Sequence, residues 1–319
     1  MNAWTYTRGL HDLGNSVYAY LQPDGTWGWS NAGFVSDGDA SLLIDTLFDL
    51  KLTREMLDTM RRSIPAAAHI DMLVNTHANG DHCYGNELVA GAQIIASSRT
   101  AHEIVTGVTP EQFAALLKAA PGMGQLGEYA YRIFSPFEFD NITLTPPDTT
   151  FEGRLTLQVG NKTVEVLEVG PAHTLGDTLV HIPADRVIFT GDILFIGGHP
   201  IMWAGPTSNW IRACDLILSL DVETIVPGHG PITDKKGVAG VKDYLEYIYA
   251  EARKRYEAGM PASEAARDIP LDKYATWSDG ERIAVNVISI YRELSGDQTH
   301  PNILNLLGQM AALALQPGF

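Results

Sequence analysis

Short apolar stretches separated by Gly, Pro, Asn and Asp fill the chain up to about residue 235. Stretches of this length, rich in β-branched and aromatic residues, predict strands. The expected strands are 16–22, a strand before the turn at Asp37, 41–46, 70–74, 92–96, 155–159, 163–169, 178–182, 186–190 and 223–226. Gly160-Asn161 predicts a two-residue hairpin turn. Strands therefore dominate this part of the chain.

Helical patterns are fewer here. Residues 52–64 predict a helix, with Thr53 as the expected N-cap, and shorter helices are expected at 84–89, at 110–120 and ending at 215–220. Residues 121–150 are rich in Gly, Pro, Asp and Thr and predict a loop, which would either cover a site or run over the surface.

The pattern changes near Val238, after which four helical segments and no strands are expected. They are 244–258, 262–268, 280–294 and 302–315. We predict a catalytic domain over residues 1–236 and an α-helical extension over 237–319. Two roles stay open for the extension: packing on the core, or forming a homodimer.

Composition limits the partners. A hydrophobic content of 45% and a charged content of 19% are ordinary for a soluble globular protein. The net charge of −16 repels phosphate backbones, so we expect no nucleic-acid partner. No run of 18 apolar residues and no secretory signal pattern occurs, so we expect no membrane partner and a cytoplasmic location. A small-molecule substrate is the expectation that remains.

Candidate chemistry begins directly after the expected strand 70–74. His77, Asp81 and His82 fall within six residues, with the carboxamide of Asn79 between them. Imidazole and carboxylate are the ligands that zinc and similar divalent metals accept. The end of a strand presents such ligands in fixed directions, so this loop predicts a catalytic metal site.

Three further loops repeat the arrangement of an apolar strand, a Gly or Pro, and then a potential ligand. They carry His173, Asp192 and His229. One such histidine alone is more often an ordinary core or surface residue. Four loops of this kind in one chain favour a metal cluster.

Taken in order, His-x-x-x-Asp-His, Gly-x-x-His-Thr-x-Gly-Asp, Thr-Gly-Asp and Pro-Gly-His-Gly resemble the metallo-β-lactamase-fold hydrolase superfamily over roughly residues 15–235. The resemblance implies an α/β fold, the αβ/βα sandwich, with one or two metal ions at its edge. Zinc is the expected ion, with iron or manganese as alternatives. By position, the first ion would take His77 and His173, the second would take Asp81, His82 and His229, and Asp192 would bridge them.

Asn79 departs from the usual His-x-His-x-Asp-His motif, because it stands where the second His is expected. A neutral amide oxygen is a weaker zinc ligand than imidazole. We therefore predict that the second site binds metal more tightly than the first. The alternative is that Asn79 only hydrogen-bonds a metal-bound water.

The resemblance implies a metal-dependent, zinc-type hydrolase. Metal-bound hydroxide, oriented by Asp81 and Asp192, would cleave an ester, lactone, amide or thioester. Thr174 and Asp177 would fix the neighbouring ligands, or serve only the turn that contains them. Two other functions stay open: a di-iron oxidoreductase on the same fold, and a degenerate member that has lost the first metal and binds a ligand.

The substrate pocket is expected from aromatic and polar residues in two Gly-rich loops. The candidates are Trp27, Trp29, His199, Trp203, Asn209 and Trp210. This mixture of apolar surface and polar tips is typical of small-molecule pockets. The alternative is that these tryptophans cap the hydrophobic core.

Overall fold

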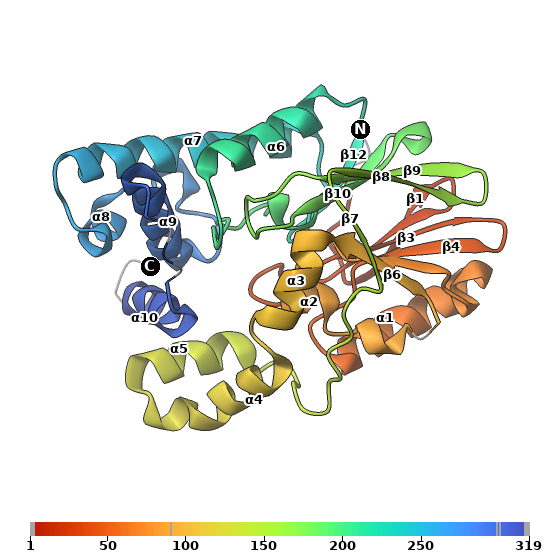
Figure 1. Ribbon diagram of the computed structural model, residues 1–319, viewed down its shortest axis with the longest axis horizontal. Coiled ribbons are helices and arrows are strands. Elements are labelled where there is room, and N and C mark those ends of the chain that lie inside the picture. The colour runs from red at the N-terminus through yellow and green to blue at the C-terminus, as the bar shows by residue number, and fades with distance from the viewer. Residues whose placement is uncertain (1–3, 90, 298, 300, 316–319) are drawn as a thin grey trace.

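Two β-sheets lie face to face in the computed structural model, on the right in Figure 1; the model describes residues 4–89, 91–297, 299 and 301–315. The larger sheet follows the chain order β1 (Gly9–Gly14), β2 (Val17–Leu21), β3 (Ala32–Asp37), β4 (Ala40–Ile44), β5 (Met72–Val74), β6 (Gln93–Ser97) and β7 (Thr149–Phe151). The smaller sheet has the order β12 (Thr224–Val226), β11 (Val187–Phe189), β10 (Thr178–Ile182), β9 (Lys162–Glu168) and β8 (Arg154–Val159). Strands β4 to β7 pair in parallel, as do β11 and β12.

The alternation of side chains along each strand builds the core. Leu42 and Ile44 on β4 face the space between the sheets, where they belong to the same cluster as Val166 and Val180. Leu43, between them, belongs to the outer cluster that includes residues of the flanking helices. Because successive side chains alternate, each central strand is buried on both faces.

Helices cover both outer faces and confirm the predicted αβ/βα sandwich. On the side of the larger sheet lie α1 (Leu50–Ser63), α2 (Gly80–Cys83) and α3 (Ser98–Thr106), and on the side of the smaller sheet lie α6 (Thr207–Ser219) and α7 (Lys235–Glu257) (Figure 1). The predicted N-cap of α1 was wrong. Asp49 caps this helix by accepting from the backbone N–H of Leu52 at 2.7 Å, whereas Thr53 is buried within it.

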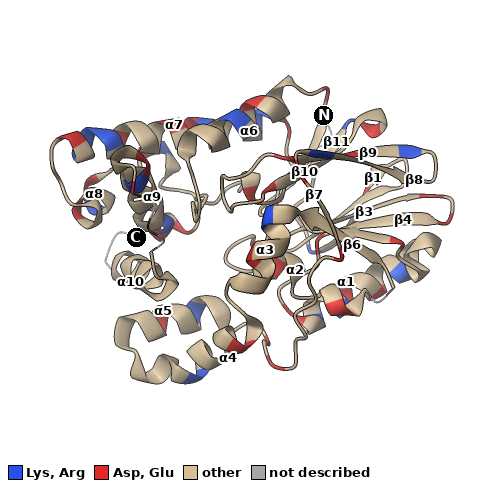
Figure 2. Cartoon of the chain, in the orientation of Figure 1, with Lys and Arg blue, Asp and Glu red and all other residues tan. Residues whose placement is uncertain are grey.

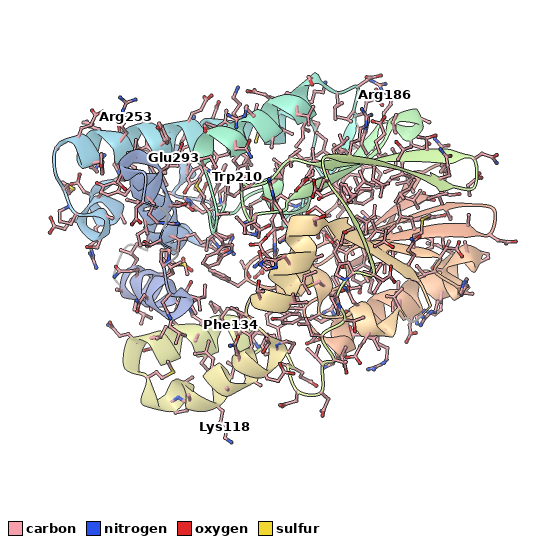
Figure 3. The ribbon with its side chains drawn as sticks, viewed as in Figure 1. Lys118, Phe134, Arg186, Trp210, Arg253 and Glu293 are labelled. Carbon is pink, nitrogen blue, oxygen red and sulfur yellow. The ribbon has the colours of Figure 1, made fainter. Side chains whose placement is uncertain are left out.

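The expected loop over residues 121–150 is wrong in part, because it contains α5 (Gly124–Phe134), which follows α4 (Pro110–Ala119). Gly127, Tyr129, Ala130, Ile133 and Phe134 are the buried residues of α5, and the spacing of the last four places them on one helical face. Helices α4 and α5 form a helical hairpin. In Figure 3, Phe134 lies on the side of α5 that faces the rest of the molecule, while Lys118 on α4 projects away from it.

The four expected C-terminal helices are present. They are α7, α8 (Ala262–Asp268), α9 (Ile283–Ser295) and α10 (Ile303–Ala314). Helix α7 packs along α6 and carries both charge signs, whereas α10 has no charged residue and packs against α5 (Figure 2). The boundary at residue 236 falls at the start of α7 and stays a prediction. No helix in the described ranges is both long and apolar enough to cross a membrane.

Candidate metal centre

The four predicted ligand loops meet around the carboxylate of Asp192, which follows β11. Its oxygens lie 3.6 Å from His77 Nε2, 3.1 Å from His82 Nε2, 3.3 Å from His173 Nε2 and 3.5 Å from His229 Nε2. These side chains follow β5, β9 and β12, and all are at least 95% buried. Two sheets therefore contribute to one site.

The donors are arranged to hold cations. Among the described residues, His77 Nε2, His82 Nε2 and Asp192 Oδ1 are buried and form no hydrogen bond, although the last two atoms lie 3.1 Å apart; a bound metal would relieve this costly state. Their ligand atoms lie within 4.8 Å of one another, as do those of Asp81, His82 and His229. Imidazole and carboxylate donors at this spacing fit the predicted metals. We call His77, Asn79 and His173 the first half-site, and Asp81, His82 and His229 the second half-site.

Backbone carbonyls orient two of the imidazoles. His173 Nδ1 donates to the carbonyl of Ile201 at 2.6 Å, and His229 Nδ1 donates to that of Gly25 at 3.1 Å. A neutral imidazole has one N–H, so each Nε2 is left with a lone pair directed toward Asp192. Ligand histidines in metal proteins are held in this way.

Asp45 orients the imidazole of His82, although it was not among the site residues predicted from the sequence. It follows β4 with a positive φ of 61°, lies 2.9 Å from His82 Nδ1, and accepts from both the backbone and the hydroxyl of Thr76 at 2.7 Å. A polar residue closing the apolar stretch 41–46 was the available signal. Burial raises the pKa of the Asp45 carboxyl, although His82 opposes this shift.

The two half-sites differ in electrostatics. Burial lowers the pKa of His77 well below its ordinary value and that of His173 to about 4. Burial alone would lower the pKa values of His82 and His229 too. The negative charges of Asp192 and Asp81 outweigh this effect, because they raise the pKa of His82 well above its ordinary value and the pKa of His229 to about 9. The second half-site is therefore the more negative environment.

Asn79 lies in the first half-site, with its side-chain oxygen 2.7 Å from His173 Nε2. Because His173 donates its one N–H to Ile201, these two atoms are both acceptors. Two acceptors this close are compatible when a cation lies between them, or when the amide turns its NH₂ toward the ring. The first of these arrangements agrees with Asn79 as a metal ligand, and its alternative role as a partner of a metal-bound water stays a prediction.

Thr174 and Asp177 hold the loop that carries His173. Asp177 accepts from the backbone and hydroxyl of Thr174, the latter at 2.7 Å, and from the backbone of Ala172. Burial raises the pKa of Asp177 to about 8 against these hydrogen bonds. The pair thus builds the turn and positions His173 through the backbone.

The expected pocket residues separate into two groups. Trp27 and Trp29 line a cavity of about 430 Å³, and Trp203 lies 6.3 Å from Trp27 by ring centroids. Trp203 also donates its backbone N–H to the carbonyl of His173, which ties this aromatic pair to the first half-site.

The other three expected pocket residues lie in packed surroundings outside that cavity lining. His199 is buried against the C-terminal segment, with Nε2 3.1 Å from the carbonyl of Tyr274. Asn209 donates to the carbonyls of Val169 and Pro171. Trp210 is buried, donates to the carbonyl of Ile193, and lies 5.9 Å from His173 by ring centroids.

Arg282, at the end of the turn before α9, was also missed. Its guanidinium carbon lies 4.5 Å from the ring centroid of Trp27 and 5.2 Å from that of Phe195. Phe195 stacks in turn on His229, with ring centroids 5.1 Å apart. No local pattern near residue 282 signals this, because its partners lie far away in the sequence.

Comparison with known proteins gives a consistent picture. A sequence model of the metallo-beta-lactamase superfamily matches residues 25–229. The stereoselective inverting sec-alkylsulfatase Pisa1 from Pseudomonas sp. has a TM-score of 0.67 at 16% identity, over 94% of this chain and 52% of that chain. The metallo-beta-lactamase from Pontibacter korlensis has a TM-score of 0.55 at 20% identity, over 75% of this chain and 99% of that chain.

One curated relative also matches. The 2,4-dinitroanisole O-demethylase subunit alpha of Nocardioides sp. (strain JS1661) is 29% identical over 90 residues, which are 26% of each chain. This chain thus covers about half the length of the alkylsulfatase and about a quarter of the demethylase subunit.

Proposed function

Because the chain belongs to the metallo-beta-lactamase superfamily, we propose that it is a metal-dependent hydrolase of a small-molecule ester, lactone, amide or thioester. The observation that carries the proposal is the set of buried, unpartnered donor atoms on His77, His82 and Asp192. The first half-site would hold one ion, the second would hold another, and Asp192 would contact both. Zinc, iron or manganese bound there would polarise the scissile group and lower the pKa of a water molecule.

The protein's own groups prepare the site. Asp192 supplies negative charge among four imidazoles, and those imidazoles hold its pKa well below the ordinary value despite burial. Asp81 has the more exposed side chain of the two carboxylates, at 13% against 4% for Asp192. We infer that a substrate approaches past Asp81, with Trp27 and Trp203 limiting access of water.

An activity screen of the metal-reconstituted protein tests the proposal. The panel contains an ester, a lactone, a thioester, an amide and a β-lactam. It adds an alkyl sulfate and an aryl methyl ether, because relatives with those substrates in their names match parts of this chain. We expect hydrolysis of at least one carbonyl substrate, abolished by chelation and by Asp192→Ala.

Metal analysis and the visible spectrum separate the two enzyme hypotheses. The donor set of imidazole, carboxylate and amide oxygen also suits iron. Iron content with a visible absorption band and oxygen consumption, without hydrolysis of the panel, would replace the hydrolase by a di-iron oxidoreductase.

A further inference from the structure

The cavity of about 430 Å³ lies between four parts of the chain. Trp27 and Trp29 come from the loop between β2 and β3, Ile133 comes from α5, Asp279 and Glu281 come from the segment before α9, and Ala314 ends α10. A cavity of this size accommodates a small organic molecule. The C-terminal segment therefore supplies part of a binding surface.

Two contacts connect the cavity to the candidate metal centre, although the residues that line it include none of the candidate ligands. The loop that carries Trp27 also provides the Gly25 carbonyl that accepts from His229 Nδ1. Next to Glu281, Arg282 lies over Phe195, the ring that stacks on His229. The cavity is therefore linked to His229 of the second half-site through these neighbouring residues.

Glu281 is the most informative residue of the lining, because it is buried and only one of its two carboxylate oxygens accepts hydrogen bonds. The residue is 8% exposed. Its Oε1 accepts from the Tyr129 hydroxyl at 2.9 Å and from Trp27 Nε1 at 3.4 Å. Its Oε2 has no partner within the described part of the chain. Glu281 lines the cavity and this oxygen is not among the fully enclosed unpaired atoms, so a molecule in the cavity that supplies a donor can reach it.

Neighbouring cations do not neutralise this carboxylate. Arg282 pairs with Asp279 at 3.1 Å and stacks on Trp27. Arg132, at the cavity rim, is exposed and lies over the ring of Tyr129 at 5.3 Å. The inner part of the cavity therefore offers hydrogen-bond acceptors between aromatic walls.

We propose that this cavity holds the non-reacting part of the substrate and selects an apolar body that carries a protonated amine. Glu281 Oε2 accepts from the amine, while Trp27 and Trp29 contact the apolar body. Hydrogen bonds between an ammonium and a carboxylate are among the strongest in proteins, and aromatic walls suit an apolar body. The assignment rests on the proposed function, because it treats the cavity as part of the hydrolase site.

Binding of two matched probes to the metal-loaded protein tests the proposal. The probes are 3-phenylpropylamine and 3-phenylpropionate, which share a phenyl ring and chain but carry opposite charges. Tryptophan fluorescence reports binding next to Trp27 and Trp29. We expect the amine to bind at least about tenfold more tightly than the carboxylate. Equal affinity, or tighter binding of the carboxylate, would overturn the proposal without any variant.

Two substitutions assign the preference to Glu281. Glu281→Gln keeps an acceptor for Tyr129 and Trp27, so we expect a folded protein in which amine affinity falls about tenfold while carboxylate affinity does not fall. Glu128→Gln removes the same charge from the exposed face of α5 and leaves the preference unchanged. Equal losses of amine affinity in both variants would contradict the role of Glu281.

The binding measurement needs no turnover, which separates the two proposals. Amine preference in a protein that hydrolyses nothing in the panel would overturn the proposed function alone. Hydrolysis by a protein without amine preference would overturn only the assignment of the cavity.

Discussion

The two half-sites of the candidate metal centre share Asp192 but differ in charge. In the first half-site, His77 and His173 have pKa values below the ordinary one because burial dominates, and Asn79 is neutral. In the second half-site, Asp81 and Asp192 raise the pKa values of both histidines, and Asp45 adds a further charge behind His82.

The neutral side chain of Asn79 is therefore only one cause of the difference in charge between the half-sites. The affinity for a divalent cation depends on the charge and type of the ligands. We therefore expect the second half-site to bind the tighter ion even where ligand number is equal. The following changes test that expectation, from the largest effect to the smallest.

Asp192→Ala removes the group common to both half-sites. We expect loss of metal from both, and a decrease in hydrolysis of roughly 1,000-fold, because several kcal/mol of charge stabilisation disappear. Elemental analysis and kcat/KM measure the two effects. Asp39→Ala, on an exposed turn, serves as the control. Retention of one full equivalent of metal would mean that the half-sites do not share this carboxylate.

Asp45→Asn affects the second half-site most directly. Asp45 contacts His82, and it reaches His77 of the first half-site only through the hydroxyl of Thr76, which lies 3.0 Å from His77 Nδ1. We expect binding of the tighter ion to weaken about 10–100-fold, the usual effect of losing an outer-shell partner, while binding of the other ion weakens less. Calorimetric metal titration measures both affinities. An equal decrease in the two would remove the proposed distinction.

Asn79→His reduces the difference in metal affinity by strengthening the first half-site. An imidazole at this position is a stronger zinc ligand than an amide, so we expect the weaker affinity to rise about tenfold and the metal content to increase. The same titration measures it. Unchanged affinity and stoichiometry would indicate that Asn79 does not contribute to the first half-site.

Glu103→Gln tests whether a buried carboxyl group that contacts the His173 loop makes the stability of the protein depend on pH. Glu103 accepts from the backbone of Leu175, in the loop of His173, and burial raises its pKa from 4.5 to about 7. The folded protein therefore keeps a proton that the unfolded chain releases, so stability is fully present below pH 4.5 and falls as the pH rises to 7. Between pH 5 and 8, we expect the free energy of unfolding of the variant, measured with urea, to fall by about 1 kcal/mol less than that of the unmodified protein. Parallel pH dependence in both proteins would exclude this linkage.

The candidate ligand loops could be proposed from the sequence because their signal is local, and the structure brings their histidines to within 3.6 Å of Asp192. Each combines an apolar strand, a Gly or Pro and a ligand within about ten residues, and the strand ends then meet at one edge. The α5 helix was missed because Gly124, Gly127 and the preceding Pro121-Gly122 outweighed its apolar face.

Residues that act across long sequence separations could not be predicted in this way. Asp45 contacts His82, which is 37 positions away, and Glu281 contacts Trp27, which is 254 positions away. The first contact follows from the parallel pairing of β4 with β5, and the second arises only when the C-terminal segment packs against the loop between β2 and β3. The candidate metal ligands could thus be proposed from the sequence, whereas the cavity required the structure.

The placement of His229 after β12 also has a consequence for synthesis of the protein. His229 follows His77 by 152 residues, so it leaves the ribosome roughly 8–30 s later at usual elongation rates. Until then the nascent chain presents His77, Asp81 and His82 without a complete second half-site. Metal loading of the second half-site is therefore expected to follow translation of β12 and His229.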